Sequence, residues 1–127
     1  MARILIIEDD PYVQRFYRRV FAFQNYEVEL ASNGEEGIEK AKILQPALIL
    51  LDIIMPGIDG LEVLKRLKAD SVTQSIHILM LTNLGEEQTV ARAMELGAEG
   101  VLVKANVSPE QLVSEVEKYV QKNAPSN

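Results

Sequence analysis

The chain has 127 residues, of which 47% are hydrophobic, so it is long and apolar enough for one domain with a single buried core. Its formal net charge is −6, and no run of lysine or arginine could follow a phosphate backbone, so we expect no direct nucleic acid binding. It has no cysteine for a disulfide, a thiolate metal site or a nucleophile, and no apolar run approaches the ~20 residues of a membrane span, so we expect a cytoplasmic protein without membrane insertion.

Five short apolar runs along the chain are predicted strands. They cover residues 4–7, 28–30, 47–51, 76–81 and 101–103. In most of these runs nearly every position is apolar, which is typical of parallel strands that are covered on both faces.

A segment with helical spacing follows each predicted strand. Apolar side chains recur there every three or four residues, and we expect each stripe to face the core. The stripes are Val13, Phe16, Tyr17 and Val20; Ile38 and Ala41; Leu61, Leu64 and Leu67; Val90, Ala93 and Met94; and Leu112, Val116, Tyr119 and Val120.

Polar residues and glycine mark where these helices begin and end. Asp10 and Asp59 are predicted N-caps, and Ser108 with Gln111 three residues later has the form of a capping box. Gly97 is predicted to end the fourth helix. The strand–helix unit therefore repeats five times, which predicts a doubly wound α/β fold with a parallel sheet. We expect one domain over residues 1–122 and a flexible C-terminal tail at 123–127.

Functional side chains collect at the carboxyl ends of the predicted strands, where open α/β sheets bind ligands. The residues that follow strands one, three, four and five are Glu8 and Asp9, Asp52, Thr82, and Lys104. Taken singly, Glu8 could be a solvated loop residue, Thr82 a strand residue bonded to the backbone and Lys104 a surface charge. Their joint placement at one edge of the sheet favours a site.

The chemistry of this edge is that of phosphoryl transfer. Crowded carboxylates repel one another unless a cation joins them, and a hard divalent ion such as Mg²⁺ binds oxygen ligands. Asp52 is the natural nucleophile, because a carboxylate can form an acyl phosphate. Thr82 could donate a hydrogen bond to one phosphoryl oxygen, and Lys104 could neutralise another.

Four segments resemble, in order and spacing, the motifs of response-regulator receiver domains. They are ILIIEDD, LILLDIIMPGIDGLEVL, ILMLTN and GVLVKA, within a resemblance that covers about residues 3 to 121. The resemblance implies a flavodoxin-like (βα)5 fold with strand order 2-1-3-4-5. It also implies that Asp52 accepts the phosphoryl group, with Thr82 as the switch hydroxyl and Lys104 as the phosphoryl-contacting lysine.

The same resemblance implies the cofactor and the partners. Mg²⁺ would be held by Glu8, Asp9, Asp52 and the backbone carbonyl of Ile54. A sensor histidine kinase or a His-phosphotransfer protein would supply the phosphoryl group, and a downstream protein target would read it. The chain would be a phosphoacceptor with slow autodephosphorylation and not a classical enzyme.

Several positions depart from the family pattern. The family usually has an aromatic residue three positions before the lysine, and Val101 stands there; a proline often follows the lysine, and Ala105 stands there. A trans peptide bond is the default before a non-proline residue, since the cis form costs about 3 kcal/mol. Ile54 and Leu84 occupy positions that border the path of the hydrolytic water in the family, and their apolar side chains predict slow dephosphorylation.

Other functions fit the residues less well. A phosphatase of the haloacid dehalogenase type would need an acidic residue two positions after the nucleophile, where Ile54 stands. A flavodoxin-like cofactor binder would need a phosphate loop after the first strand, where carboxylic residues stand instead. A degenerate receiver would lack part of the Asp, Thr and Lys set. A receiver fragment of a longer regulator with a separate output domain stays open.

Overall fold

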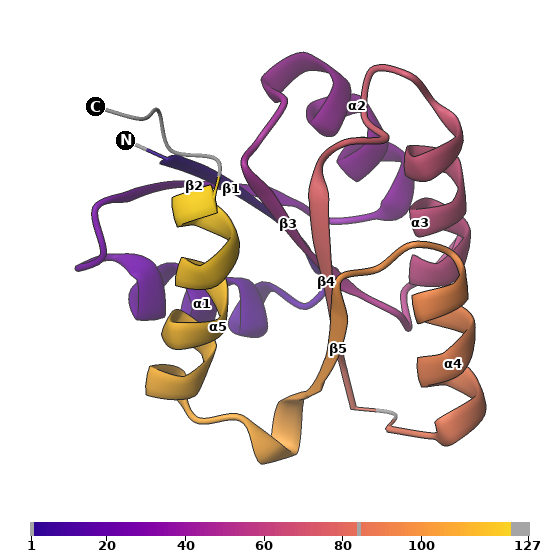
Figure 1. Cartoon of the computed structure of the whole chain (residues 1–127). Coiled ribbons are helices and arrows are strands. Elements are labelled where there is room, and N and C mark those ends of the chain that lie inside the picture. The colour runs from indigo at the N-terminus through magenta and orange to yellow at the C-terminus, as the bar shows by residue number, and fades with distance from the viewer. Residues whose placement is uncertain (1, 84, 123–127) are drawn as a thin grey trace.

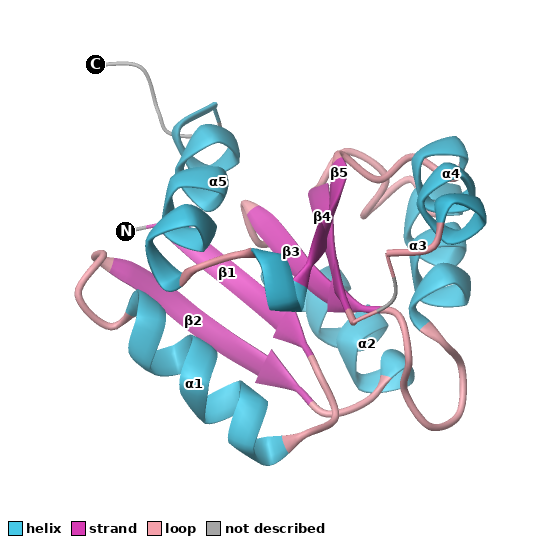
Figure 2. Cartoon of the chain, turned by 90° about the horizontal axis from the view of Figure 1, so that it is seen from below, coloured by secondary structure: helices cyan, strands magenta, loops and turns pink. Residues whose placement is uncertain are grey.

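The computed structural model describes residues 2–83 and 85–122. Within these residues five strands form one parallel sheet in the order β2-β1-β3-β4-β5 (Figures 1 and 2), which confirms the predicted topology. The strands are β1 (Ala2–Ile7), β2 (Tyr26–Ala31), β3 (Leu48–Asp52), β4 (His77–Thr82) and β5 (Gly100–Val103).

Helices cover both faces of the sheet, so the domain has three layers. The helices are α1 (Pro11–Phe21), α2 (Gly34–Leu44), α3 (Gly60–Ala69), α4 (Glu87–Glu95) and α5 (Pro109–Lys122), with a short 3-10 turn η1 (Lys104–Asn106) after β5. Helices α1 and α5 lie on one face, and α2, α3 and α4 lie on the other (Figure 1). The predicted tail at 123–127 lies outside the described residues.

The core consists of two apolar clusters, one on each face of the sheet. Successive side chains of a strand point to opposite faces. In β3, therefore, Ile49 and Leu51 pack toward α2 and α3, while Leu48 and Leu50 pack toward α1 and α5. All five residues of β3 are buried, as its continuous apolar run predicts.

The predicted helix caps are confirmed. The Asp10 carboxylate accepts from the Tyr12 amide at 2.8 Å, and the Asp59 carboxylate accepts from the Glu62 amide at 2.9 Å. Ser108 and Gln111 form a capping box, in which the Ser108 amide donates to Gln111 Oε1 at 2.8 Å and the Gln111 amide donates to Ser108 Oγ at 3.1 Å. These caps start α1, α3 and α5 next to the strand ends that they follow.

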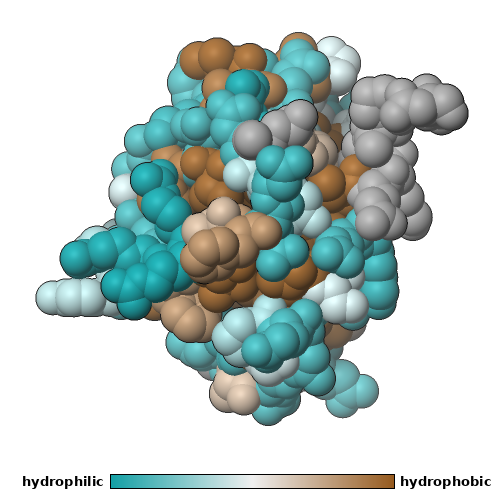
Figure 3. All heavy atoms as spheres, turned by 90° about the vertical axis from the view of Figure 1, so that its left-hand side faces the viewer, coloured by the Kyte–Doolittle hydropathy of each residue, from teal (hydrophilic) through white to brown (hydrophobic). Residues whose placement is uncertain are grey.

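Two predicted core positions are wrong. Phe16 is 49% exposed and Met94 is 46% exposed, because each lies at the margin of its helix's apolar stripe and turns outward. With Tyr12 and Phe23, both strongly exposed, Phe16 leaves aromatic surface on and just after α1. On the face that carries α1 and α5, apolar atoms are visible between hydrophilic side chains (Figure 3).

Among the described helices, none has the length and apolar character that crossing a bilayer requires.

Candidate functional site

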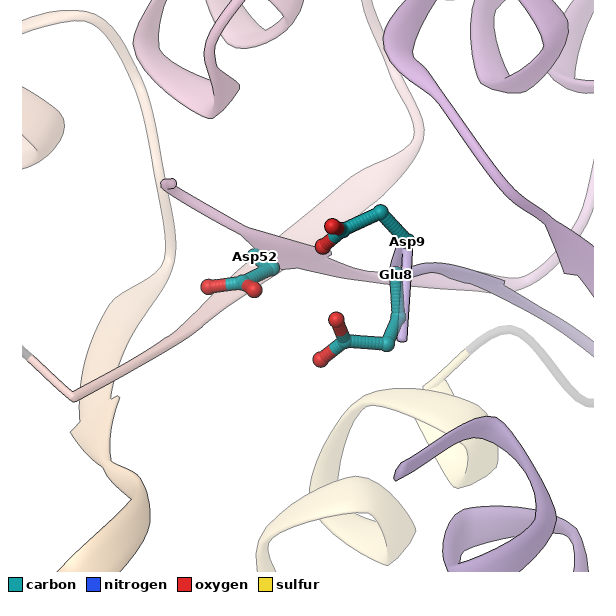
Figure 4. Close-up of side chains that lie close together, drawn as sticks. All are labelled: Glu8, Asp9 and Asp52. Atoms are coloured by element: carbon teal, nitrogen blue, oxygen red, sulfur yellow. The ribbon is translucent and has the colours of Figure 1, made fainter. Parts of the chain in front are cut away.

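Three carboxylates converge at the carboxyl edge of the sheet. Strands β1 and β3 are neighbours, paired through Ile7 and Leu51, so the residues that end them lie side by side. One oxygen each from Glu8, Asp9 and Asp52 lies within 4.8 Å of the others, and Figure 4 shows the three side chains close together at the ends of β1 and β3. The sequence predicted this cluster correctly.

Local backbone contacts fix the Asp52 carboxylate. The Ile53 amide donates to Asp52 Oδ1 at 2.8 Å, and the loop after β3 folds back so that the Gly60 amide donates to the Ile53 carbonyl at 2.7 Å. A Cβ at position 60 would collide with the Asp52 carbonyl oxygen, so only glycine allows this close approach. Gly57 has a φ of 79°, a conformation that also favours glycine. One oxygen of Asp52 is therefore held by the loop, and the other is directed toward the site.

Lys104, which follows the edge strand β5, contacts two of the three carboxylates. Its Nζ lies 2.7 Å from Glu8 Oε1 and 3.3 Å from Asp52 Oδ2. The three side chains are only 16%, 3% and 10% exposed, in the order Lys104, Glu8, Asp52. Buried charges are costly unless they are paired, so this lysine offsets charge that the cluster would otherwise leave uncompensated.

Burial and the ionic contacts also shift the pKa values of Glu8 and Lys104. Burial raises the pKa of Glu8 above its ordinary value, although hydrogen bonds from Lys104 and the Asp10 amide oppose the change. Burial by itself would lower the pKa of Lys104, but its hydrogen bond to Glu8 and the charges of Asp52 and Glu8 outweigh burial and leave that pKa raised. Lys104 therefore stays an ammonium group at neutral pH.

An open cavity of about 240 Å³ gives access to the cluster. It is lined by Glu8, Asp9, Asp10, Val13, Asp52, Ile54, Asn83 and Lys104. Ile54 is 58% exposed at its mouth, and its predicted role as a carbonyl ligand stays a prediction. Thr82 ends β4 and is fully buried, one position beyond the Asp52–Leu81 pair, so it lies beside the site but does not line this cavity. Leu84, the other predicted water-path residue, lies outside the described residues.

The predictions for Asp10 and for the Lys104–Ala105 bond are confirmed. The Asp10 side chain caps α1, as expected, and also borders the cavity. Among the described residues no peptide bond is cis, so the Lys104–Ala105 bond is trans. His77 lies at the opposite end of β4, where its Nδ1 is 2.7 Å from Glu99 Oε1.

A hydrogen bond that holds the backbone of Glu8 in place was not predicted from the sequence. Gln14 donates from Nε2 to the Glu8 carbonyl at 2.5 Å and to Ser32 Oγ at 3.2 Å, so it ties the end of β1 to α1 and to the residue that follows β2. No sequence pattern predicts this contact, because it depends on how α1 packs against the sheet.

This topology and this edge define a flavodoxin-like α/β domain with an acidic, oxygen-rich ligand site. Residues 4–117 match the family model of the response regulator receiver domain. The chain therefore belongs to the receiver domain family of two-component response regulators.

Individual relatives agree with this assignment. The chain is 40% identical to the DNA-binding dual master transcriptional regulator RpaA of Synechocystis, over 82% of this chain and 43% of that protein. It is 34% identical to the transcriptional regulatory protein ResD of Bacillus subtilis, over 94% of this chain and 48% of that protein. The chain thus spans about half the length of the curated relatives that it matches.

Two solved structures are similar to this chain over nearly its whole length. The chemotaxis protein CheY4 of Vibrio cholerae superposes with a TM-score of 0.87 at 29% identity, covering 94% of this chain and 98% of CheY4. A putative response regulator from Chloroflexus aurantiacus gives a TM-score of 0.87 at 32% identity, with the same coverage of both chains.

Proposed function

We propose that this chain accepts a phosphoryl group on Asp52 and, once phosphorylated, changes which protein it binds. The observation that carries the proposal is the position of the Asp52 carboxylate. One of its oxygens accepts from the Ile53 amide, and the other faces Lys104 at 3.3 Å within the acidic cluster. A fixed carboxylate beside a cation site and an ammonium group is the arrangement that phosphoryl transfer to an aspartate requires.

The acidic cluster fits a magnesium ion. Three carboxylate oxygens within 4.8 Å of one another repel unless a cation lies among them, and Lys104 contacts only two of the three side chains. Glu8, Asp9 and Asp52 would hold the ion, with the Ile54 carbonyl as a further ligand. Bound Mg²⁺ would supply positive charge to the phosphoryl oxygens.

The transfer itself needs few protein groups. An Asp52 oxygen forms a bond to phosphorus while the bond from phosphorus to the donor's imidazole nitrogen breaks, and that nitrogen keeps the electron pair and takes a proton from solvent. Lys104 is positioned to pair with a phosphoryl oxygen, and Thr82 is the hydroxyl that would bond to another. The protein modifies itself once per cycle, so we propose a phosphoacceptor and not a classical enzyme.

The donor in this proposal is a sensor histidine kinase or a His-phosphotransfer protein in the cytoplasm. Helix α1 begins beside the site, at the Asp10 cap, and leaves Tyr12 and Phe16 exposed. Exposed aromatic side chains are frequent anchors of protein interfaces. A donor protein seated on this surface would reach Asp52.

A receiver within a longer regulator is the second candidate. It is favoured by the finding that the chain spans about half of its curated relatives. The gene sequence beyond codon 127 distinguishes a separate output domain from a stand-alone receiver.

Phosphorylation should depend on magnesium and on Asp9. With acetyl phosphate as donor, we expect intact-mass analysis to find one added phosphoryl group in Mg²⁺ and none in excess chelator. Asp9→Ala should weaken Mg²⁺ binding by about tenfold or more, because it removes one of three carboxylate ligands. Asp70→Ala, which removes a carboxylate at the C-terminal end of α3, is the matched control. Full labelling in chelator would contradict the metal assignment.

The phosphorylated state should be long-lived because Ile54 is apolar. Its side chain lies at the cavity mouth, where a polar group could orient the attacking water. After removal of the donor, Ile54→Asn should lose the phosphoryl group several times faster than the wild type, whereas Ile43→Asn, an exposed position on α2, should not. An unchanged decay rate in Ile54→Asn would show that this side chain does not control water access.

Switching should use β4, β5 and the segments that follow them, without an aromatic lever. Val101 packs against the core cluster on the α4 side and pairs with Met80 of β4. Because it is a valine, it has no ring that could rotate. In amide spectra recorded with and without beryllofluoride and Mg²⁺, the shifts outside the site should concentrate at residues 82–105. Shifts confined to α2 would require a different route.

A further inference from the structure

Tyr17 is a buried tyrosine whose hydroxyl has no evident structural purpose. It lies on the inward face of α1, 5% exposed, in the apolar cluster between α1, α5 and the sheet. Its ring packs 5.7 Å from the ring of Phe16. Within residues 2–83 and 85–122, no hydrogen bond of the Tyr17 hydroxyl is found, and the fully buried polar side-chain atoms without a partner do not include its oxygen, so this oxygen faces open space and not the packed core. A phenylalanine would fill the same apolar space, so the oxygen calls for an explanation.

The hydroxyl end of Tyr17 lies near the ionic site. Tyr17 and Lys104 line the same cavity of about 200 Å³, whose other walls are mostly apolar side chains of α1 and α5. Burial raises the pKa of Tyr17 to about 12, Lys104 lowers it, and the charges of Glu8 and Asp52 raise it further. These groups are therefore close enough to act on one another electrostatically, and the phenol is neutral at physiological pH.

Lys104 needs another acceptor when the site is loaded. Its ammonium group has three N–H donors, and its contacts are with Glu8 at 2.7 Å and Asp52 at 3.3 Å. A divalent cation among the carboxylates would draw the same Glu8 oxygens away from the lysine. The lysine stem would then lie in a mostly apolar cavity, where the Tyr17 oxygen is a neutral acceptor.

We propose that Tyr17 is a positioning residue for Lys104: its hydroxyl oxygen accepts a hydrogen bond from Nζ when the Glu8 carboxylate turns to a divalent cation, and so keeps the ammonium group directed at Asp52. The proposal rests on the proposed function for the presence of the cation. It assigns Tyr17 no contact with the phosphoryl group.

A double-mutant cycle on Mg²⁺ affinity tests the proposal without any phosphorylation. Amide shifts of residues 8–10 and 52 during a Mg²⁺ titration report the dissociation constant. Tyr17→Phe should raise it by about three- to tenfold, because Lys104 then competes harder for Glu8. In a Lys104→Met background the same substitution should have no effect, since no ammonium group competes. Tyr26→Phe, which removes a hydroxyl at the start of β2, is the control and should leave the constant unchanged.

A merely structural role gives a different result. If Tyr17→Phe weakens Mg²⁺ binding equally in both backgrounds, or in neither, the assignment of Tyr17 to Lys104 is overturned. Urea unfolding of each variant verifies that the comparisons are made on folded protein.

A second measurement uses no metal. Glu8→Ala removes the closer acceptor of Lys104, so the ¹⁵N resonance of Lys104 Nζ should shift as the lysine turns to Tyr17. Loss of the Glu8 contact shifts this resonance in Glu8→Ala with Tyr17→Phe as well, but to a different position because the Tyr17 acceptor is missing, and an identical resonance in both variants would overturn the proposal. If the wild type binds no Mg²⁺, the metal assignment fails separately, and this measurement alone decides the role of Tyr17.

Discussion

Asp52→Asn should abolish phosphoryl incorporation. The substitution keeps the size of the side chain and an oxygen that can accept from the Ile53 amide, but the amide is a far weaker nucleophile than the carboxylate. With acetyl phosphate and Mg²⁺, labelling should fall by at least about 100-fold relative to the wild type, measured by intact mass over time. The loss should occur without unfolding, because the variant also removes one charge from a crowded acidic cluster.

The matched control is Asp59→Asn, which makes the same chemical change at a helix cap. Asparagine caps helices about as well as aspartate, so α3 should stay intact and labelling should be unchanged. Incorporation that persists in Asp52→Asn would place the acceptor at another residue and would defeat the proposed function.

Lys104→Ala should slow labelling by about 10²- to 10³-fold and should also destabilise the metal-free protein. The lysine is the cation that contacts both Glu8 and Asp52, and Glu8 is almost completely buried. Removing one partner of a buried ion pair leaves the other charge uncompensated, which costs about 3 kcal/mol in comparable cases. The reduced labelling follows from the loss of the positive charge that would pair with the phosphoryl oxygens.

Urea unfolding, with a control variant, separates the loss of stability from the loss of labelling. Urea unfolding with and without Mg²⁺ should find that the ion restores more stability to Lys104→Ala than to the wild type, because it replaces the missing positive charge. Lys118→Ala, at an exposed pair with Glu115, should change the unfolding free energy by no more than about 0.5 kcal/mol and should label normally. Wild-type labelling by Lys104→Ala would remove the lysine from the proposed mechanism.

The fold was predictable from the sequence because its signals are local. The apolar run that ends at Asp52 describes a strand buried on both faces, and Asp10, Asp59 and Ser108 cap the helices that follow by contacts within three residues. A cap unrecognised in the sequence, Asn33 at the start of α2, also acts locally, since its side chain accepts from the Glu36 amide at 2.8 Å. The strand order was predicted by family resemblance, as periodicity does not specify it.

The sequence by itself determined which residues stand at the strand ends and which chemistry they share. Only the tertiary structure decided how they pair: Lys104 contacts Glu8 across 96 positions of the chain, and Tyr17 lines a cavity together with Lys104. Sequence spacing predicted that Phe16 faces the core, whereas packing leaves it half exposed. The physical reason is that the spacing of apolar residues and the helix caps depend on neighbours a few residues apart. Ion pairing and burial depend on the relative placement of whole helices and strands.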